Sequence, residues 1–315
     1  MTVCFLPVQS KRQLGTFAGL LALCLILWAA TPHFLTVSNL LNVLEQTAIN
    51  AIVAVGMTFV IISGGIDLSV GSILALSGIA LGVALQSGAG APLAITLALA
   101  VGLACGLVNG ALVTFGRLPP FIATLGMMSV ARGAALMLAE GRPISGFGEE
   151  FRGLATGRVL MVPAPAIIAA GIYAVAHFVL ANTVFGRAAY AIGGNEEAAR
   201  LSGVHVRYHK TAIYGVAGLM SAAAAVILTA RLNSAQPTAG TMYELDAIAA
   251  TVIGGTSLLG GEGTILGALI GALIMGVLRN GLNLLNVSSF FQQVVIGVVI
   301  IGAVLVDMSL KRHRR

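Results

Sequence analysis

Long runs of apolar residues, separated by short polar stretches, repeat along almost the whole chain. A helix needs about 20 predominantly apolar residues to cross the hydrocarbon core of a bilayer. The pattern therefore predicts an all-α membrane protein with about ten transmembrane helices. The predicted segments are 14–30, 46–62, 70–86, 92–115, 121–139, 163–182, 211–230, 246–259, 263–278 and 290–306.

Some of these helices are predicted to be broken at glycine-rich segments. The segment 246–259 is short for a complete span, so we expect it to be broken or re-entrant. Gly64-Gly65 followed by 71–76 resembles Gly254-Gly255 followed by 263–268. Such paired, Gly-interrupted segments indicate an internal duplication with broken helices, although glycine-rich membrane sequences also resemble one another by chance.

Glycines also recur at a helical spacing. Gly102, Gly106 and Gly110 stand four residues apart, as do Gly263, Gly267 and Gly271. Residues four apart share one face of a helix, and small residues there allow close approach of a neighbouring helix. We expect both sets to be packing strips.

Composition excludes an ordinary soluble domain. Of 315 residues, 58% are hydrophobic and 9% are charged, and the mean hydropathy is +0.99, whereas soluble domains carry about 25% charged residues. The net charge of +6 does not indicate nucleic-acid binding, because the basic residues flank apolar runs. That distribution is typical of a multi-pass protein of a bacterial inner membrane.

The basic residues also predict the orientation. With the N-terminus inside, eleven of them fall in cytoplasmic segments and five in external ones, which favours both termini in the cytoplasm. The cytoplasmic set is Lys11, Arg12, Arg117, Arg187, Arg200, Arg207, Lys210, Lys311, Arg312, Arg314 and Arg315; the external set is Arg142, Arg152, Arg158, Arg231 and Arg279. The first segment is either a retained helix, which this pattern favours, or a cleaved signal peptide.

Two longer polar stretches interrupt the apolar series: 140–162, predicted to be an external loop, and 183–210, predicted to be cytoplasmic. Neither is large enough for a separate domain, so residues 1–315 form a single transmembrane domain. Cys4, Cys24 and Cys105 are isolated and give neither a disulfide framework nor metal-ligand spacing. We expect no metal and no cofactor.

Two charged residues stand within apolar surroundings. Asp67 follows Gly64-Gly65 between two long apolar runs, and Arg132 interrupts the run 121–139. A charge in the hydrocarbon region is costly and usually faces a cavity or a partner. Asp67 either contacts a polar solute or caps the next helix; Arg132 either pairs internally, with Asp67 as one partner, or reaches an interface.

Neutral polar residues complete the candidate substrate pathway: Asn50, Asn109, Thr124 and Asn283. Amides and hydroxyls supply donors and acceptors without net charge, which suits an uncharged polyhydroxy solute. Each one taken singly is equally well explained by a bond to a neighbouring helix.

The stretch 195–203 predicts a short helix in the cytoplasmic loop. Asn195 suits the N-cap, Glu196 and Glu197 suit the first turn, and Gly203 suits the left-handed position after the last turn. A short charged helix between two spans is shaped for docking into a groove of a partner. The alternative is a helix lying on lipid, which its poor apolar face disfavours.

The chain lacks the motifs for hydrolysing ATP itself. A phosphate-binding loop needs Gly before Lys-Ser/Thr, but Lys210-Thr211 follows His209. No Gly-x-Ser-x-Gly or His-Glu-x-x-His motif occurs either. The sequence therefore predicts no enzyme; energy from ATP must come from a partner.

Several motifs, taken in order, resemble ribose-type monosaccharide ABC permeases. They are 56–72, Asn109-Gly110, 118–126, Ala131-Arg132-Gly133, 191–195 and 254–263. Glu197-Ala198-Ala199 with Gly203 also resembles the coupling motif of ABC import permeases, although Ile213-Tyr214-Gly215-Val216 departs from its continuation.

This resemblance implies a sugar importer subunit with three kinds of protein partner. They are a cytoplasmic ATP-binding subunit, a periplasmic solute-binding protein and a second permease copy, identical or related, all within membrane lipid. Asn195, Glu196, Glu197, Arg200 and Gly203 would contact the ATPase, and the loop 140–162 would help to receive the binding protein.

Three alternatives remain at this point. Within the ABC class, the substrate is a branched-chain amino acid or an autoinducer rather than a sugar. An ion-coupled secondary transporter would need more intramembrane carboxylates or histidines. A membrane-embedded enzyme would need a paired acid and base or a metal site, and no such constellation appears in the sequence.

Overall fold

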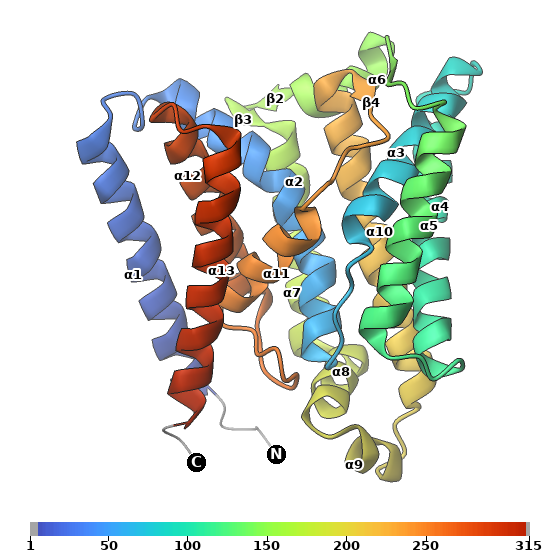
Figure 1. Ribbon diagram of the computed structural model, residues 1–315, viewed down its shortest axis with the longest axis vertical. Helices are drawn as coiled ribbons and strands as arrows, with labels where there is room; N and C mark the ends of the chain where they lie inside the picture. The colour runs from blue at the N-terminus through green and yellow to red at the C-terminus, as the bar shows by residue number, and fades with distance from the viewer. Residues whose placement is uncertain (1–5, 313–315) are drawn as a thin grey trace.

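The computed structural model describes residues 6–312, and the side chains of residues 13–305 (Figure 1). Cys4 and the basic side chains of Lys11, Arg12 and the tail 311–315, used above, lie outside the described residues. The elements are α1 (Leu6–Ala30), α2 (Val37–Ile62), α3 (Val70–Gln86), α4 (Ala91–Thr114), α5 (Pro120–Leu138), β1 (Ile144–Ser145), α6 (Glu149–Thr156), β2 (Arg158–Val159), β3 (Val162–Pro163), α7 (Ala164–Asn182), α8 (Val184–Gly194), α9 (Glu196–Leu201), α10 (Val206–Leu232), β4 (Ser234–Ala235), α11 (Tyr243–Ile253), α12 (Ile265–Leu284) and α13 (Ser289–Arg312).

The described chain is an all-α membrane protein. Seven helices are long and apolar enough to cross a bilayer, namely α1, α2, α4, α5, α7, α10 and α12. The helix α3 and the apolar part of α13 are shorter, and α11 has 11 residues. At about 1.5 Å per residue, α11 covers roughly half of a hydrocarbon core of about 30 Å. The prediction that 246–259 does not form a complete span is confirmed.

The helix α2 lies at the centre of the bundle, between α10, α7, α11 and α12 (Figure 1). From Thr47 to Ile62 almost every side chain is buried, including Met57, Phe59 and Ile61. A helix that is apolar on all sides is stable only when it is surrounded by other helices. The sequence of α2 therefore sets its central place.

The glycine strips mostly pack as predicted. A Cβ at Gly106 or Gly110 would clash with the backbone of α10, so these glycines let α4 and α10 lie in close contact. Gly267 and Gly271 do the same for α12 against α11. Gly263 differs, because it precedes the helix and lies in the loop with a φ of +156°.

Two short helices begin inside the bundle (Figure 1). Residues 63–69 lead from α2 to α3, and residues 236–242 lead from β4 to α11; we call these the first break and the second break. The second break touches the first turn of α3, which directly follows the first break, since a Cβ on Gly71 would collide with the carbonyl oxygen of Gly240. The N-terminal ends of α3 and α11, which carry partial positive charge, therefore meet midway between the ends of the bundle.

The sequence echo does not match these two breaks. Gly64-Gly65 opens the first break, but Gly254-Gly255 follows α11 in the loop 254–264. The structural counterpart of the first break is 236–242 instead. Both glycine pairs nevertheless lie in the same neighbourhood, because Gly260 in the later loop approaches Gly64.

The two ends of the bundle differ in structure. The first turn of α1, the last turn of α13, α8 and α9 lie at one end, the α9 end (Figure 1). At the opposite end, the α6 end, β1 pairs antiparallel with β4, and β2 with β3. Several predicted positions are corrected: α2 begins at Val37 rather than at 46, α10 begins at Val206 rather than at 211, and Arg279 lies within α12 rather than in an external loop.

Candidate functional site

A buried polar cluster fixes the first break. The Oδ1 atom of Asp67 accepts hydrogen bonds from the backbone nitrogen of Ser69 at 2.8 Å and from its hydroxyl at 2.5 Å. The amide of Asn109, on α4, donates to the same hydroxyl at 2.8 Å. Asp67 and Asn109 are both fully buried. Asp67 thus orders the segment before α3; it does not cap the helix itself, since the N-cap is Ser69 and no side-chain cap hydrogen bond is made there.

Thr124 holds the same segment from α5. Its hydroxyl donates to the carbonyl of Pro120 at 2.9 Å and lies 3.4 Å from the carbonyl of Ile66 in the first break. Asp67, Asn109 and Thr124, which are far apart in sequence, therefore come together around one non-helical segment.

Three buried atoms at this cluster have no hydrogen-bond partner in the described chain. They are Oδ2 of Asp67, Oδ1 of Asn109 and the hydroxyl of Tyr214, which lies against Gly65. Leaving such a group unpaired costs about 1–3 kcal/mol. The first break is therefore surrounded by buried polar atoms that are still free to form hydrogen bonds.

Arg132 does not pair with Asp67. Its guanidinium donates through Nη1 to the carbonyls of Pro237 at 2.7 Å and Ala239 at 2.8 Å, and it interacts electrostatically with Glu244. Arg132 therefore anchors the second break to α5. This position agrees with internal pairing, although the partners are backbone carbonyls and a different acid.

Asn50 and Asn283 lie on helices, outside both breaks. Asn50 is on α2, and its side-chain oxygen is buried without a partner in the described chain. Asn283, at the end of α12, accepts a hydrogen bond of 2.8 Å from Gln292 of α13. Their place in a substrate pathway stays a prediction.

The sequence did not reveal an ion pair that ties α11 to α12. Arg279 donates through Nη2 to both carboxylate oxygens of Asp246, at 2.7 and 2.6 Å. Asp246 is 2% exposed, so this pair holds a buried charge. The available signal was an acid and a base inside adjacent apolar segments, which membrane helices tolerate mainly as partners.

At the α9 end, the predicted short helix is confirmed. Asn195 caps α9 by accepting a hydrogen bond of 3.0 Å from the backbone nitrogen of Ala198, and Gly203 has a φ of +87°. Glu197 and Arg200 form an exposed ion pair at 2.6 Å. The helix presents these charged side chains to solvent, where a partner can reach them.

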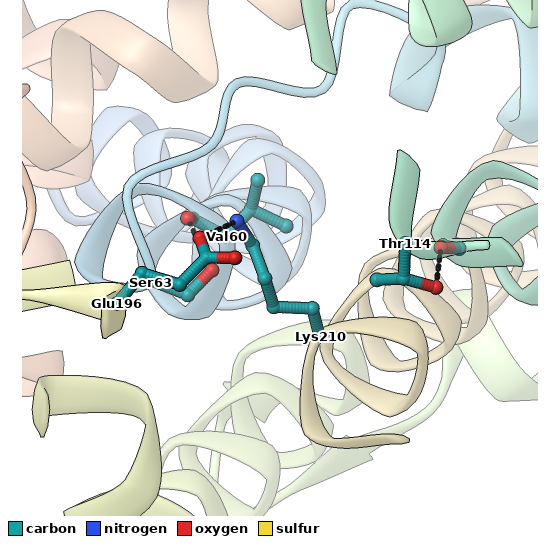
Figure 2. Close-up of polar contacts among 6 residues, drawn as sticks. Val60, Ser63, Thr114, Glu196 and Lys210 are labelled. Carbon is teal, nitrogen blue, oxygen red and sulfur yellow. Dashed lines mark hydrogen bonds and ion pairs between the residues drawn. The ribbon is translucent and has the colours of Figure 1, made fainter. Parts of the chain in front are cut away.

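Lys210, near the start of α10, ties α9 to that helix. Its ammonium group, on a side chain that is almost buried, lies 2.8 Å from the carboxylate of Glu196. Figure 2 shows the Lys210 side chain extending towards Val60 and Ser63, at the end of α2. A cation is stabilised there by the carbonyls of the last helical turn. Movement of α9 can therefore reach the first turn of α10 through one side chain that points towards the end of α2.

A second connection is made by backbone alone. Gly193, at the end of α8, is packed so tightly against Ile62 and Gly261 that it has no room for a Cβ. Gly261 donates a hydrogen bond of 2.9 Å to the carbonyl of Ile62. The segment before α9, the start of the first break and the loop 254–264 thus meet at one glycine junction.

Beside α9 lies a groove of about 720 Å³ between α4, α9 and α10. Basic side chains predominate in its walls, which include Arg117, Arg200, Arg207 and Lys210 as well as Glu196 and Glu197. The α9 end therefore offers a charged, concave surface of a kind suited to a protein contact.

A model of the family described as "Branched-chain amino acid transport system / permease component" matches residues 39–304. The chain belongs to this family. It is accordingly a multi-pass protein of the inner membrane and a transport component rather than an enzyme.

Individual relatives match over nearly their whole length. The ribose import permease protein of Bacillus subtilis (strain 168) is 54% identical over 298 residues, covering 94% of this chain and 92% of that protein. The ribose import permease protein of Escherichia coli (strain K12) is 51% identical over 293 residues, covering 92% and 91%. The D-allose transport system permease protein of the same strain is 37% identical over 300 residues, covering 95% and 92%. No solved structure matches the chain.

Proposed function

We propose that this chain is the membrane-spanning subunit of an ATP-driven importer for a monosaccharide, ribose or a related sugar. The observation that carries this proposal is the 54% identity to a ribose import permease over 94% of the chain. The chain itself has no phosphate-binding loop, so a separate subunit hydrolyses ATP.

A branched-chain amino acid is the second candidate substrate. The family description names that class, and the electrostatic pair of Arg132 and Glu244 supplies two opposite charges of the kind a zwitterion needs. The sugar remains the better candidate, because the relatives quoted above at 37–54% identity are named as permeases for ribose and allose.

The proposed contact with the ATP-binding subunit is α9. Its exposed charges and its links to α2 through Lys210 and Gly193 support this role. Binding or release at α9 would move the first break and so bias the two states of the pathway. The residues assigned to this contact are Asn195, Glu196, Glu197, Arg200 and Gly203.

At the opposite end, the loop 140–162 is proposed to receive the periplasmic solute-binding protein. The loop contains α6, whose first turn carries Glu149 and Glu150, together with the exposed Arg142. Mixed charges suit a transient polar contact. This assignment places the α6 end outside the cell and the α9 end in the cytoplasm.

The proposed topology has about ten membrane segments and both termini in the cytoplasm. The first turn of α1 and the last turn of α13 lie at the same end as α9 (Figure 1), and the basic residues favour that end. The helices α3 and α11 each cover only part of the membrane, but each runs together with its preceding break from one end of the bundle to the other (Figure 1), which supports counting 63–86 and 236–253 as one membrane segment each.

A second permease copy and lipid are proposed to cover the remaining surface. Large apolar side chains are exposed along α13, among them Phe290, Val294 and Val298, and such a face suits lipid. The proposed substrate pathway contains Asn50, Asp67, Asn109, Thr124, Arg132 and Asn283. A conduit beside the breaks needs an opposite wall, and a second copy would supply it.

Reconstitution in liposomes tests the proposal. The chain, its ATP-binding subunit and its binding protein are combined, and uptake of labelled ribose, allose and leucine is measured with and without ATP. ATP-dependent uptake of a sugar is the expected result. Uptake of leucine alone, or sugar uptake driven by an ion gradient without the ATPase, would contradict it.

A further inference from the structure

Polar side chains are exposed on the second break and on neighbouring turns of α5 and α11. Figure 1 shows α11 beginning about midway between the ends of the bundle. Thr238 and Thr241 of the second break are exposed, and Glu244 in the first turn of α11 is half-buried. From α5, Arg132 is half-buried and Ser129, one turn earlier on the same helix face, is exposed. We call these five residues the central polar face.

The negative charge of this face belongs to Glu244, and its carboxylate is surrounded by groups from several elements. The carboxylate of Glu244 lies against Gly71, where a Cβ would come within 2.7 Å of one of its oxygens. Glu244 is thus in the first turn of α11 and beside the first turn of α3. Two helix N-termini and the guanidinium of Arg132 thus lie on the side of Glu244 that favours a negative charge and partly offset the cost of its burial.

Two backbone carbonyls fix the position of the Arg132 guanidinium, which still has N–H groups free to donate hydrogen bonds. Its Nη1 atom makes both bonds to the carbonyls of Pro237 and Ala239. A guanidinium has five N–H donors, so several remain for a solute at the exposed side. Thr241 donates its hydroxyl hydrogen to the carbonyl of Thr238 at 2.8 Å, which leaves the oxygen able to accept.

Lipid does not suit this face. Charged and polar side chains at mid-membrane depth normally face protein or a water-filled cavity. On α13, by contrast, the exposed large side chains are mostly apolar, with Gln293 as an exception. The central polar face therefore suits contact with protein or water better than contact with lipid.

We propose that the central polar face binds the sugar during its passage, with Glu244 accepting hydrogen bonds from sugar hydroxyls and Arg132 donating to sugar oxygens. The opposite charges of Glu244 and Arg132 leave the pair without net charge, which disfavours a solute with a net charge; the preference for a sugar over a zwitterion rests on the relatives quoted above. This inference rests on the proposed function and adds Glu244, Thr238, Thr241 and Ser129 to the residues assigned above.

The test compares sugars that lack single hydroxyl groups. The reconstituted complex imports ribose and its monodeoxy derivatives, with wild type, Glu244→Gln and Thr241→Val assayed in parallel. Glu45→Gln is the matched control for the acid, because Glu45 is a half-buried carboxylate 3.9 Å from Arg231. Thr96→Val is the control for the hydroxyl, because Thr96 also donates to its own helix backbone.

We expect Glu244→Gln to lower ribose uptake at limiting sugar by roughly tenfold or more, the size of a lost hydrogen bond to a charged group. One deoxy sugar lacks the hydroxyl that donates a hydrogen bond to Glu244. Wild type and Glu244→Gln should import this sugar equally. Thr241→Val should show a smaller effect of the same kind. Both controls should import every sugar like wild type.

Assembly and ATP hydrolysis separate binding from folding. The variants should co-purify with the ATP-binding subunit and hydrolyse ATP at wild-type rates. A loss of the same size for every sugar, in both variants, would overturn the proposed sugar contact, as would unchanged uptake. If wild type imports no sugar with ATP, the proposed function itself fails, and the inference fails with it.

Discussion

The two breaks look alike in outline but differ in what surrounds them. The first break, 63–69, is largely enclosed by α4 and α5, and neutral groups of Asn109 and Thr124 hold it. The second break, 236–242, is open on one side, and a charged group, Arg132, holds it. The first break also contains its own buried carboxylate, Asp67, so the two segments differ in enclosure and in whether the group that reaches them from a neighbouring helix is neutral or charged.

Their connections differ in the same way. The first break starts where α2 ends, next to Lys210 and the glycine junction that lead to α9. The second break leads from β4, at the α6 end, into α11. This arrangement suits two separate roles. The enclosed first break moves when the ATP-binding subunit moves, and the open second break contacts the solute.

The largest effect on stability is expected from Arg279→Met beside the second break. The change would leave Asp246, which is 2% exposed, as a buried charge without its bidentate partner. Breaking a buried pair in this way costs about 3–5 kcal/mol. Unfolding in detergent, followed by tryptophan fluorescence or calorimetry, measures the change.

Arg142→Met, at an exposed position, is the control and should change the free energy of unfolding by less than about 0.5 kcal/mol. The double variant Asp246→Asn with Arg279→Gln should recover part of the loss. Equal stability of Arg279→Met and wild type would show that the second break does not depend on this charge.

The next largest effect on stability is expected where the first turn of α3 touches the second break. In Gly71→Ala, the new methyl group collides with the carbonyl of Gly240 and with the carboxylate of Glu244. Overpacking of this kind costs about 1–3 kcal/mol. Gly133→Ala on α5 is the control, because nothing lies within 4 Å of its Cβ position. Similar melting temperatures of the two variants would contradict close contact between the breaks.

A smaller effect is expected from Asn109→Ala at the first break. The change removes one hydrogen bond to Ser69 but also removes a buried oxygen that has no partner in the described chain. A net loss of about 1 kcal/mol follows. Asn182→Ala, at the exposed end of α7, is the control. If Asn109→Ala lowered the free energy of unfolding as much as Arg279→Met, neutral hydrogen bonds at the first break would be as important as the charged pair beside the second break, which would contradict the comparison.

The smallest change in stability is expected from Lys210→Met, because its partner Glu196 stays solvated at the surface. The free energy of unfolding should fall by less than about 1 kcal/mol. Coupling should nevertheless suffer, with ATP hydrolysis retained and sugar import lowered in the reconstituted complex. Arg187→Met, at an exposed position on α8 outside the groove beside α9, is the control. Full import by Lys210→Met would remove this side chain from the coupling route.

Local signals in the sequence were sufficient for the helices and for α9. The cap at Asn195 and the turn at Gly203 depend on residues within one or two turns, and both are found as expected. Apolar runs likewise located the membrane helices, and the short run 246–259 indicated an incomplete one.

The partners of the charged residues could not be predicted in the same way. Arg132 contacts carbonyls more than 100 residues away, and Asp246 pairs with Arg279 on the next helix. Such pairs depend on how helices pack, which a single sequence does not specify. Glu244 was missed because it falls just before the predicted segment 246–259, in the first turn of the observed α11.

The number of sugar molecules imported per ATP hydrolysed tests the division between the two breaks most directly. This ratio is measured for Lys210→Met and Glu244→Gln with ribose and each of its deoxy derivatives. The account predicts that Lys210→Met lowers the ratio by the same factor for every sugar, whereas the factor for Glu244→Gln depends on which hydroxyl is present. A uniform factor for Glu244→Gln, or a sugar-dependent one for Lys210→Met, would contradict it.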